Sequence, residues 1–278
     1  MSDSSRTDGR SSGAGLRAAG VSRAFKGVQA LQDVTLELSP HEVVGLIGPN
    51  GAGKTTLINL LTGFDRPTSG TIELDGRDVT GWNPPRRAHA GLARTFQHGH
   101  VFSELSVREN VELGALGVAG AGEARRRARE LLAALDLERH ERLPAGTLPH
   151  GEQRKVAVAR ALAARPRYVL MDEPAAGLPE SDVEPFAGLI RSVRDRYEAG
   201  VLIVDHNMAL MMEVSDRIEV LDQGRTLARG TPDEIRRNID VAAAYLGESV
   251  MAEDERVVAE DERVVAEDER VVAEDEDA

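Results

Sequence analysis

Short apolar runs and longer amphipathic stretches alternate along most of the chain. The apolar runs are rich in Val, Ile and Leu and predict strands. They lie at 34–38, Val43–Ile47, 70–74, 168–171, 201–204 and 217–221. Between them, stretches rich in Ala, Arg, Glu and Leu predict helices at 120–141, Glu180–Arg196 and Met208–Val214. Because strands and helices alternate throughout residues 16–250, we expect this part of the chain to form an α/β domain.

Both ends of the chain differ from this pattern. Residues 1–15 are rich in Ser and Gly, so we expect a disordered leader and no secretory signal there. Residues 251–278 contain the heptapeptide VVAEDER twice in succession, with a truncated copy before it and an altered copy after it. A coiled coil needs apolar residues three and four apart, whereas Val257 and Val258 are adjacent and most other positions are charged. The tail is therefore predicted to be solvated, either disordered or a frayed helix.

The composition narrows the class of protein. Of the 278 residues, 41% are hydrophobic and 29% are charged, as in soluble globular proteins. Aromatic residues make up only 3%, so the core must be built from aliphatic side chains. No run approaches the roughly 20 apolar residues that cross a bilayer. The absence of cysteine excludes a disulfide framework, and together these features predict a cytoplasmic protein.

The acidity of the chain belongs to its tail. The net charge is −13, and residues 251–278 carry thirteen acidic residues and three Arg, or −10, which leaves −3 for the rest. A nucleic-acid-binding surface needs a basic stripe, which this nearly neutral body does not offer. We therefore expect no nucleic-acid partner.

The strongest chemical motif follows the predicted strand Val43–Ile47. Residues 48–56, here called the phosphate loop, fit the pattern G-x-x-x-x-G-K-[ST] between this strand and a predicted helix at 55–62. The loop consists of Gly48, Pro49, Asn50, Gly51, Ala52, Gly53, Lys54, Thr55 and Thr56. Glycines let successive backbone N–H groups surround a phosphate, and a helix N-terminus adds partial positive charge. Lys54 would contact the β- and γ-phosphates and the Thr55 hydroxyl would bind Mg²⁺.

A second motif lies at the end of the predicted strand 168–171, where Asp172 and Glu173 follow. An acid that faces a phosphate loop can hold Mg²⁺, directly or through water. A neighbouring acid can orient and partly deprotonate an attacking water molecule. Adjacent surface charges are the alternative interpretation of this pair.

Just before that strand, Leu148, Pro149, His150, Gly151 and Glu152 precede the helical run VAVARALAA. Here the chain resembles the ATP-binding cassette (ABC) family, whose signature reads LSGGQ before such a helix. The family's other motifs occur in the family's order. They are the phosphate loop, Gln97, the signature at 148–152, Asp172-Glu173 and His206, with residues 175–181 in the place of the D-loop. The resemblance covers about residues 16–250.

This resemblance implies an ATP hydrolase with ATP and Mg²⁺ as cofactors. Lys54, Glu173 and His206 would be the catalytic residues, with Glu173 as the base and His206 in contact with the γ-phosphate. Gln97 would lie near Mg²⁺, together with Thr55 and Asp172, and link hydrolysis to a membrane partner. Phe25, placed upstream of the first strands, would stack on adenine. A core role for Phe25, a solvated Gln97 and a structural His206 are the alternatives.

The resemblance also implies a fold and a way of assembling. We expect a P-loop NTPase of the ABC type, with a mixed core sheet, an antiparallel β element near the N-terminus and a helical subdomain at about 98–163 that carries the signature. In this family two cassettes face head to tail, so residues 148–152 would contact the ATP of a partner cassette.

The signature is altered, since Pro149 replaces its serine and Glu152 its glutamine. Proline offers neither a hydroxyl nor an N–H group, so two donors to the γ-phosphate are lost. We therefore expect an asymmetric heterodimer in which the ATP site that uses Pro149 is impaired. The alternatives are a homodimer, and a signature whose remaining backbone donors suffice.

Two segments narrow the resemblance further. The run ARTFQHGHVFSELSVRENVELGA and the ending at 229–248 look like the ATP-binding subunits of branched-chain amino acid importers. Those importers combine two different ATPase subunits, transmembrane permease subunits and an external substrate-binding protein. The chain would then lie on the cytoplasmic face of the membrane, attached through the permease. The ATPase of lipopolysaccharide export is one alternative, and a soluble ABC ATPase of DNA repair or translation is another.

Overall fold

The computed structural model describes residues 15–95 and 101–245. The predicted leader, apart from Gly15, and the predicted tail lie outside the described residues. The strands are β1 (Leu16–Phe25), β2 (Val28–Leu38), β3 (Val43–Ile47), β4 (Ser69–Leu74), β5 (Arg77–Asp78), β6 (Leu92–Thr95), β7 (Tyr168–Asp172), β8 (Gly200–Val204), β9 (Arg217–Asp222) and β10 (Arg225–Gly230). The α-helices are α1 (Lys54–Thr62), α2 (Pro84–His89), α3 (Val107–Leu116), α4 (Ala121–Ala134), α5 (His150–Ala163), α6 (Glu180–Arg196), α7 (Met208–Val214) and α8 (Pro232–Arg236).

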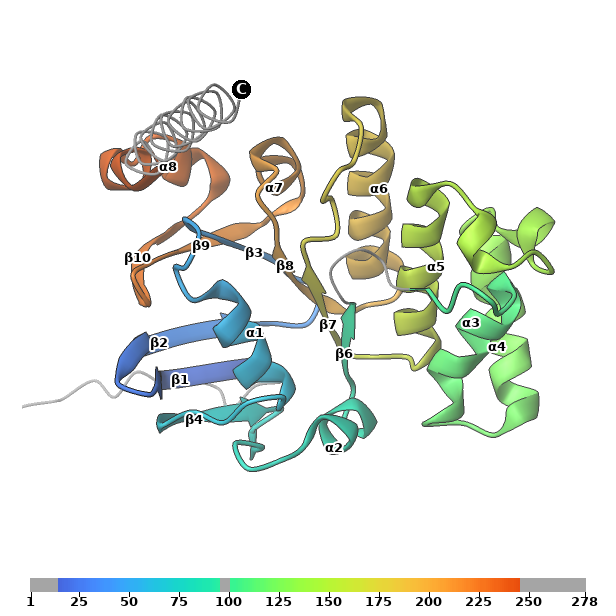
Figure 1. The fold of residues 1–278 in the computed structure, drawn as a ribbon, viewed down its shortest axis with the longest axis horizontal. Helices are drawn as coiled ribbons and strands as arrows, with labels where there is room; N and C mark the ends of the chain where they lie inside the picture. The colour runs from blue at the N-terminus through green and yellow to red at the C-terminus, as the bar shows by residue number, and fades with distance from the viewer. Residues whose placement is uncertain (1–14, 96–100, 246–278) are drawn as a thin grey trace, which may run out of the picture.

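Two sheets organise the described residues (Figure 1). The core sheet has the strand order β10-β9-β3-β8-β7-β6. Its strands from β9 to β6 are parallel, and β10 is an antiparallel edge strand. The second sheet is antiparallel and has the order β2-β1-β4-β5. The mixed core sheet and the antiparallel element near the N-terminus are therefore both present, as the sequence predicts.

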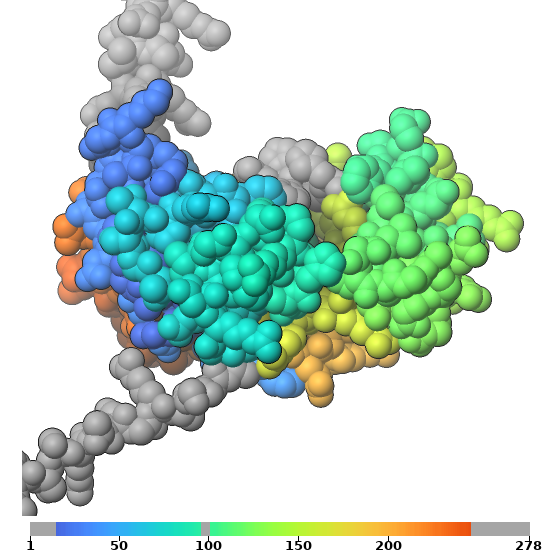
Figure 2. Space-filling model, turned by 90° about the horizontal axis from the view of Figure 1, so that it is seen from below, coloured from blue at the N-terminus to red at the C-terminus, as the bar shows by residue number. Residues whose placement is uncertain are grey.

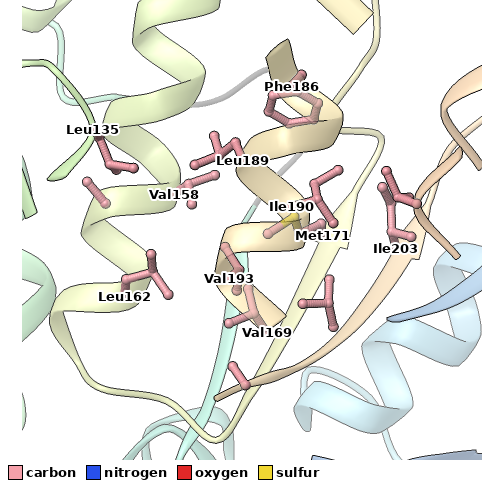
Figure 3. Close-up of a cluster of buried hydrophobic side chains, with 14 of the residues drawn as sticks. Leu135, Val158, Leu162, Val169, Met171, Phe186, Leu189, Ile190, Val193 and Ile203 are labelled. Carbon is pink, nitrogen blue, oxygen red and sulfur yellow. The ribbon is translucent and has the colours of Figure 1, made fainter. Parts of the chain in front are cut away.

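Alternate residues of the central strands point into two separate cores. Val169, Met171 and Ile203 pack against α6 and α5 (Figure 3). Their neighbours Leu170 and Leu202 join the other cluster, with α1 and the antiparallel sheet. Because successive strand side chains point to opposite faces, a strand covered on both faces needs an apolar residue at every position. This requirement explains the uninterrupted apolar runs of β3, β7 and β8, in which every residue is buried.

The helices α3, α4 and α5 pack together beside the two sheets (Figures 1 and 2). Ser106 and Glu109 form a capping box at the start of α3, in which each side chain satisfies a backbone N–H of the other residue. Gly114 lets α3 approach α5 closely, because a Cβ atom at this position would lie 1.9 Å from the carbonyl oxygen of Arg160. The helical region that carries the signature segment thus depends on one small residue.

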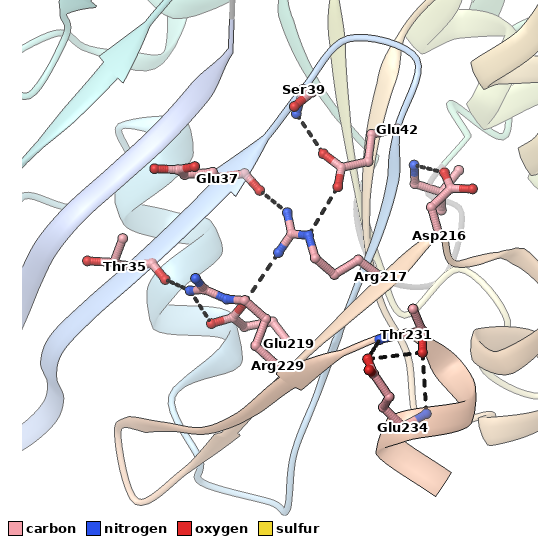
Figure 4. Close-up of polar contacts among 11 residues, drawn as sticks. Thr35, Glu37, Ser39, Glu42, Asp216, Arg217, Glu219, Arg229, Thr231 and Glu234 are labelled. Carbon is pink, nitrogen blue, oxygen red and sulfur yellow. Dashed lines mark hydrogen bonds and ion pairs between the residues drawn. The ribbon is translucent and has the colours of Figure 1, made fainter. Parts of the chain in front are cut away.

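A buried carboxylate joins the two sheets (Figure 4). Glu219 on β9 is fully buried and accepts hydrogen bonds from Arg229 at 2.6 and 2.8 Å. Arg229 also donates to the carbonyl oxygen of Thr35, and Arg217 donates to that of Glu37, both at 2.7 Å. Because Thr35 and Glu37 belong to β2, the two arginines link the core sheet to the antiparallel sheet. The charge of Glu219 is compensated within this network, as a buried carboxylate requires.

Several sequence predictions of individual elements are confirmed and others are wrong. Val43–Ile47, Glu180–Arg196 and Met208–Val214 have the predicted bounds. The helix predicted at 120–141 is wrong beyond Ala134, because Asp136 adopts a left-handed φ of 58° and only a short 3₁₀ turn follows at Glu138–His140.

The N-terminal strands also differ from the prediction. The strand predicted at 34–38 begins six residues earlier, at Val28. Phe25 does not precede the first strands but ends β1. The irregular register of β1 on β2, with shifts between Ala18 and Ala24, explains why its sequence shows no simple alternation of apolar and polar residues.

Replacing Gly114 by Ala is expected to lower the free energy of unfolding by about 1–3 kcal/mol, because the added methyl group would clash with the backbone of α5. Gly122→Ala in α4 is the matched control, since a Cβ there meets nothing within 4 Å. It should raise the stability by up to about 1 kcal/mol through helix propensity. Urea unfolding of both variants measures the two effects. Changes of the same sign would contradict the importance of the close approach.

Candidate functional site

The phosphate loop connects β3 to α1, and its backbone conformation requires glycine at two positions. Gly48 has a φ of 152°, and a Cβ atom there would lie 2.1 Å from the carbonyl oxygen of Leu221. Gly53 has a φ of 101°, and a Cβ atom there would lie 2.7 Å from the carbonyl oxygen of Ala30. The loop is therefore confined between neighbouring backbone segments, with the N-terminus of α1 directly behind it.

Lys54 is the first residue of α1 and is only 7% exposed. Its Nζ donates hydrogen bonds to the carbonyl oxygens of Gly48 at 2.6 Å and Pro49 at 2.8 Å. The ammonium group thus lies against the same loop whose backbone the motif is expected to wrap around phosphate. Lys54, which follows the glycine loop in the sequence, therefore also contacts this loop in the structure.

Asp172 is the last residue of β7 and is 6% exposed. Its Oδ2 accepts a hydrogen bond from Arg94 at 2.8 Å. Arg94 also donates to Asn59 at 2.8 Å, and Asn59 lies on α1. Arg94 therefore connects the acid of the second motif to the helix that follows the phosphate loop. Sequence reasoning missed Arg94, because its partner Asp172 lies 78 positions away in the sequence.

Glu173 and His206 are brought together from adjacent strands. Glu173 follows β7, His206 follows β8, and their side chains approach with 3.3 Å between Nε2 of His206 and Oε1 of Glu173. Glu173 has a φ of 46°, in the left-handed region that favours glycine. Its backbone N–H donates to the carbonyl oxygen of Val204 at 2.7 Å, which holds this conformation. A strained, charged residue at a strand end is typical of a functional position.

Asp205 is a second residue that sequence reasoning missed. It is 4% exposed and accepts hydrogen bonds from the backbone N–H groups of Ala175 at 2.7 Å and Asn207 at 2.9 Å. Burial raises the pKa of its carboxyl group above the ordinary value, although these N–H donors act in the opposite direction. Asp205 thus fastens the segment after Glu173 to the segment that carries His206. An acid between an apolar strand and a histidine was the available signal.

The signature segment surrounds the N-terminus of α5. Pro149 is the N-cap residue, and its carbonyl oxygen accepts hydrogen bonds from the N–H groups of Glu152 and Gln153, both at 3.0 Å. The side chain of Gln153 donates to the carbonyl oxygen of Leu148 at 2.8 Å. Proline suits the start of a helix because it lacks the N–H group that would have no intrahelical partner there.

The carboxylate of Glu152 faces an arginine and a histidine of its own helical region. Arg139 donates to Oε1 of Glu152 at 2.9 Å, and Nε2 of His140 lies 3.1 Å from Oε2. Both partners belong to the 3₁₀ turn Glu138–His140. The residue that replaces the glutamine of the signature is therefore paired within the chain.

The signature helix also contacts the segment after Glu173. Arg154, on α5, donates a hydrogen bond to the carbonyl oxygen of Ala176. Burial lowers the pKa of Arg154, and the nearby charges of Asp205 and Asp182 oppose this effect. Arg154 is the third contact residue that sequence reasoning missed.

Phe25 and Gln97 are the two remaining residues that the sequence predicts for the site. Phe25 is 43% exposed, and the guanidinium group of Arg23 lies 4.4 Å from the centre of its ring. The alternative that Phe25 is a core residue is therefore wrong, and its ring is accessible at the surface. Gln97 lies outside the described residues.

The residues present fit a magnesium ion that is bound together with phosphates. Within residues 15–95 and 101–245, no group of three or more His, Cys, Asp or Glu side chains could hold a metal. The candidate ligands are hard oxygen atoms, the hydroxyl of Thr55 and the carboxylate of Asp172. Mg²⁺ characteristically takes one or two protein ligands and completes its shell with water and substrate phosphates.

Two models of known protein families match the sequence. A family model described as "ABC transporter" matches residues 31–176. The chain therefore belongs to the ABC transporter family, whose ATP-binding cassettes hydrolyse ATP. A second family model, described as "Branched-chain amino acid ATP-binding cassette transporter", matches residues 225–250.

Curated relatives resemble the chain over most of its length. The "High-affinity branched-chain amino acid transport ATP-binding protein LivG" of Salmonella typhimurium is 41% identical over 246 residues, 83% of this chain and 96% of that protein. The corresponding protein BraF of Pseudomonas aeruginosa is 40% identical, over 84% of this chain and 98% of its own length. The "Lipopolysaccharide export system ATP-binding protein LptB" of Escherichia coli is 37% identical, over 84% and 97% of the two chains.

Solved structures agree with the fold. The ADP conformation of MJ1267, an ATP-binding cassette of an ABC transporter, has a TM-score of 0.78 and 27% identity, over 84% of this chain and 98% of that chain. The dimeric cassette MJ0796 bound to ADP and Pi has a TM-score of 0.69 and 27% identity, over 78% and 98%. The predicted fold class, including the helical region that carries the signature, is confirmed. No helix of the described residues has both the length and the apolar character that crossing a membrane requires.

The buried carboxylate of Asp205 gives a pH-dependent prediction. Because burial raises its pKa from the ordinary 3.8, the folded protein holds this proton more tightly than the unfolded chain. Between the ordinary and the raised pKa, the contribution of Asp205 to the free energy of unfolding therefore falls as the pH rises. Asp205→Asn removes this titration, so the stability of the wild type minus that of the variant should be larger at about pH 5 than at about pH 7.5.

Urea unfolding at both pH values measures that difference. A difference that increases with pH would mean that the N–H donors outweigh burial, so that the pKa of Asp205 is lowered instead.

Proposed function

We propose that this chain is the ATPase subunit of an importer for branched-chain or other hydrophobic amino acids, and that its ATP site is built from the phosphate loop and the Glu173–His206 pair. The main support for this ATP site is the 3.3 Å distance between Glu173 and His206, which follow the adjacent strands β7 and β8. The next strand of the same sheet, β3, leads into the phosphate loop. The names of the relatives support the substrate class.

ATP would be held by residues 48–56. The backbone N–H groups of the loop and the N-terminus of α1 favour phosphate, and Lys54 adds a full positive charge. Thr55, Asp172 and Gln97 would hold Mg²⁺, which neutralises phosphate charge when bound. Phe25 would stack on the adenine, since its ring is accessible.

Hydrolysis would use Glu173 as the general base for the attacking water molecule. His206 lies within reach of this carboxylate and would position it while contacting the γ-phosphate. The left-handed backbone of Glu173 and the hydrogen bond from its N–H group to Val204 fix the point from which this side chain leaves the backbone.

A second cassette would complete each ATP site with its signature segment, and the dimeric relative bound to ADP and Pi supports this arrangement. A heterodimer fits the altered signature, because Pro149 cannot donate to a phosphate and the charge of Glu152 is directed at Arg139 and His140. The site completed by the signature of this chain would be the weaker one.

Transmembrane permease subunits would bind in a groove of about 470 Å³ between the sheets and the helical region. Phe64, Leu113 and Val118 line it, and all three are exposed large hydrophobic residues. Exposed apolar surface that is concentrated in one groove favours a protein partner. Residues of α2, β6, α3 and α5 form the walls of this groove. The chain would thus lie on the cytoplasmic face of the membrane, with an external binding protein supplying the substrate.

Glu173→Gln tests the ATP site. The variant should bind ATP as the wild type does, because the phosphate loop is unchanged, and should lose activity by about 100-fold or more because an amide cannot accept the proton. ATP binding and phosphate release are measured on the full chain assembled with its membrane partners. Glu184→Gln, on α6 with a side chain that is 71% exposed, is the matched control and should keep normal turnover. Normal hydrolysis by Glu173→Gln would contradict the assignment of the base.

Pro149→Ser tests the asymmetry. The serine restores one hydroxyl and one N–H donor, and a hydrogen bond to a charged group contributes about 1.5–3 kcal/mol, so turnover of the assembled transporter should increase by about 10-fold or more. Pro149→Ala restores the N–H group alone and should give an intermediate rate. Equal rates for the three proteins would show that the existing backbone donors suffice.

A further inference from the structure

Arg94 forms a buried ion pair with the acid that the proposed function assigns to Mg²⁺. Its Nη2 donates a hydrogen bond to Oδ2 of Asp172 at 2.8 Å. The side chain of Arg94 is 10% exposed and that of Asp172 is 8% exposed. Because the pair is shielded from water, the charge of this guanidinium group is screened much less than that of a surface arginine. Asp172 therefore has a cation beside it before any metal ion arrives.

The other end of the guanidinium group is held by α1. Nη1 of Arg94 donates to Oδ1 of Asn59 at 2.8 Å and to Oγ1 of Thr62 at 3.4 Å. The Thr62 hydroxyl donates in turn to the carbonyl oxygen of Ile58 at 2.7 Å, which fixes its place on the helix. These acceptors carry no charge, so they position the arginine without cancelling its charge. Arg94 would therefore stay in place if a metal ion took over the carboxylate of Asp172.

The residues that hold Arg94 share a face of α1 with the other proposed metal ligand, Thr55. Asn59 lies four residues after Thr55, and Thr62 three residues after Asn59, which places the three side chains on one side of the helix. Along the helix axis, Thr55 and Asn59 are about 6 Å apart. A metal ion held between Thr55 and Asp172 would thus lie next to the positive charge of Arg94.

We propose that Arg94 determines which form of the metal the site accepts: it keeps Asp172 from binding a divalent cation alone and admits the metal only together with the nucleotide. The proposal rests on the proposed function, in which Thr55 and Asp172 hold Mg²⁺. A free divalent cation meets the positive charges of Arg94 and Lys54, and like charges repel strongly in a buried site. The negative charge of a triphosphate reverses this balance. The site therefore selects the metal–nucleotide complex over the metal ion.

A purely structural role for Arg94 leads to a different expectation. Arg94 joins β6 to α1 and β7, so its removal could alter the site without any effect of charge. Two variants separate these roles. Arg94→Lys keeps the positive charge with fewer donors, and Arg94→Gln keeps an amide donor without the charge.

The test measures Mn²⁺ binding to the nucleotide-free full chain by electron paramagnetic resonance, in which the signal of the free ion is lost on binding. Arg94→Gln should bind Mn²⁺ about 10-fold or more tightly than the wild type, because a neutral side chain removes the repulsion. Arg94→Lys should stay within about 3-fold of the wild type, because its charge remains. With ATP present, the three proteins should differ by less than about 3-fold, because the nucleotide supplies the compensating charge.

Asp172→Asn identifies where the ion binds. It should leave the nucleotide-free Mn²⁺ affinity of the wild type unchanged, and it should abolish the gain when it is combined with Arg94→Gln. Arg167→Met is the matched control, since Arg167 forms an ion pair with Asp75 at 2.6 Å just before β7 begins. It removes the cation from an aspartate near the opposite end of the strand and should not change Mn²⁺ binding.

The outcomes separate the two proposals. A wild-type protein that binds no ATP, with or without Mn²⁺, would overturn the proposed function itself. A wild-type protein that binds ATP with Mn²⁺, together with an Arg94→Gln variant whose nucleotide-free Mn²⁺ affinity is normal, would overturn only the role of Arg94.

Two further results would also overturn the role of Arg94. Equal gains in Arg94→Gln and Arg94→Lys would show that the hydrogen bonds matter rather than the charge. A wild-type chain whose nucleotide-free Mn²⁺ binding is weakened by Asp172→Asn would show that the arginine does not exclude the metal. This last comparison needs no substitution of Arg94, so it decides the question even if Arg94→Gln does not fold.

Discussion

The parallel pairing of β3, β8 and β7 is the constraint on which the site depends. Parallel strands place their carboxyl ends at one edge of a sheet, and each of these three strands is followed by a functional segment. The phosphate loop follows β3, Asp172 and Glu173 follow at the end of β7, and Asp205 and His206 follow β8. Residues more than 150 positions apart in the sequence are thereby brought to the same edge of the sheet. A shift in register by one residue would turn the buried side chains of these strands to the opposite face.

Burial on both faces is what makes this edge rigid. The central strands contribute alternate residues to two cores, one shared with α5 and α6 and the other with α1 and the antiparallel sheet. The network around Glu219 fixes the second sheet relative to the first. The proposed catalytic groups thus follow strands that are buried on both faces, while the signature is carried by a separate set of helices.

The sequence predicted those parts of the molecule that depend on contiguous residues. The phosphate loop, the acidic pair and His206 are short motifs beside apolar runs, and the buried strands have an unambiguous pattern. Arg94 and Arg154 could not be found in this way, because their importance lies in partners far away in the sequence, such as Asp172 for Arg94. Asp205 was missed although it lies between an apolar run and His206, where such a signal was present. The end of α4 was missed because Asp136 leaves the helical conformation without a glycine or proline to mark the place.

The backbone of Glu173 carries a consequence for the evolution and engineering of this protein. A left-handed φ of 46° raises the energy of any residue other than glycine, by about 1–2 kcal/mol. Selection for thermal tolerance alone would favour glycine or asparagine at this position, and would remove the proposed base in doing so. When variants are screened for stability alone, a substitution of Glu173 that stabilises the fold would therefore be selected although it removes the proposed base.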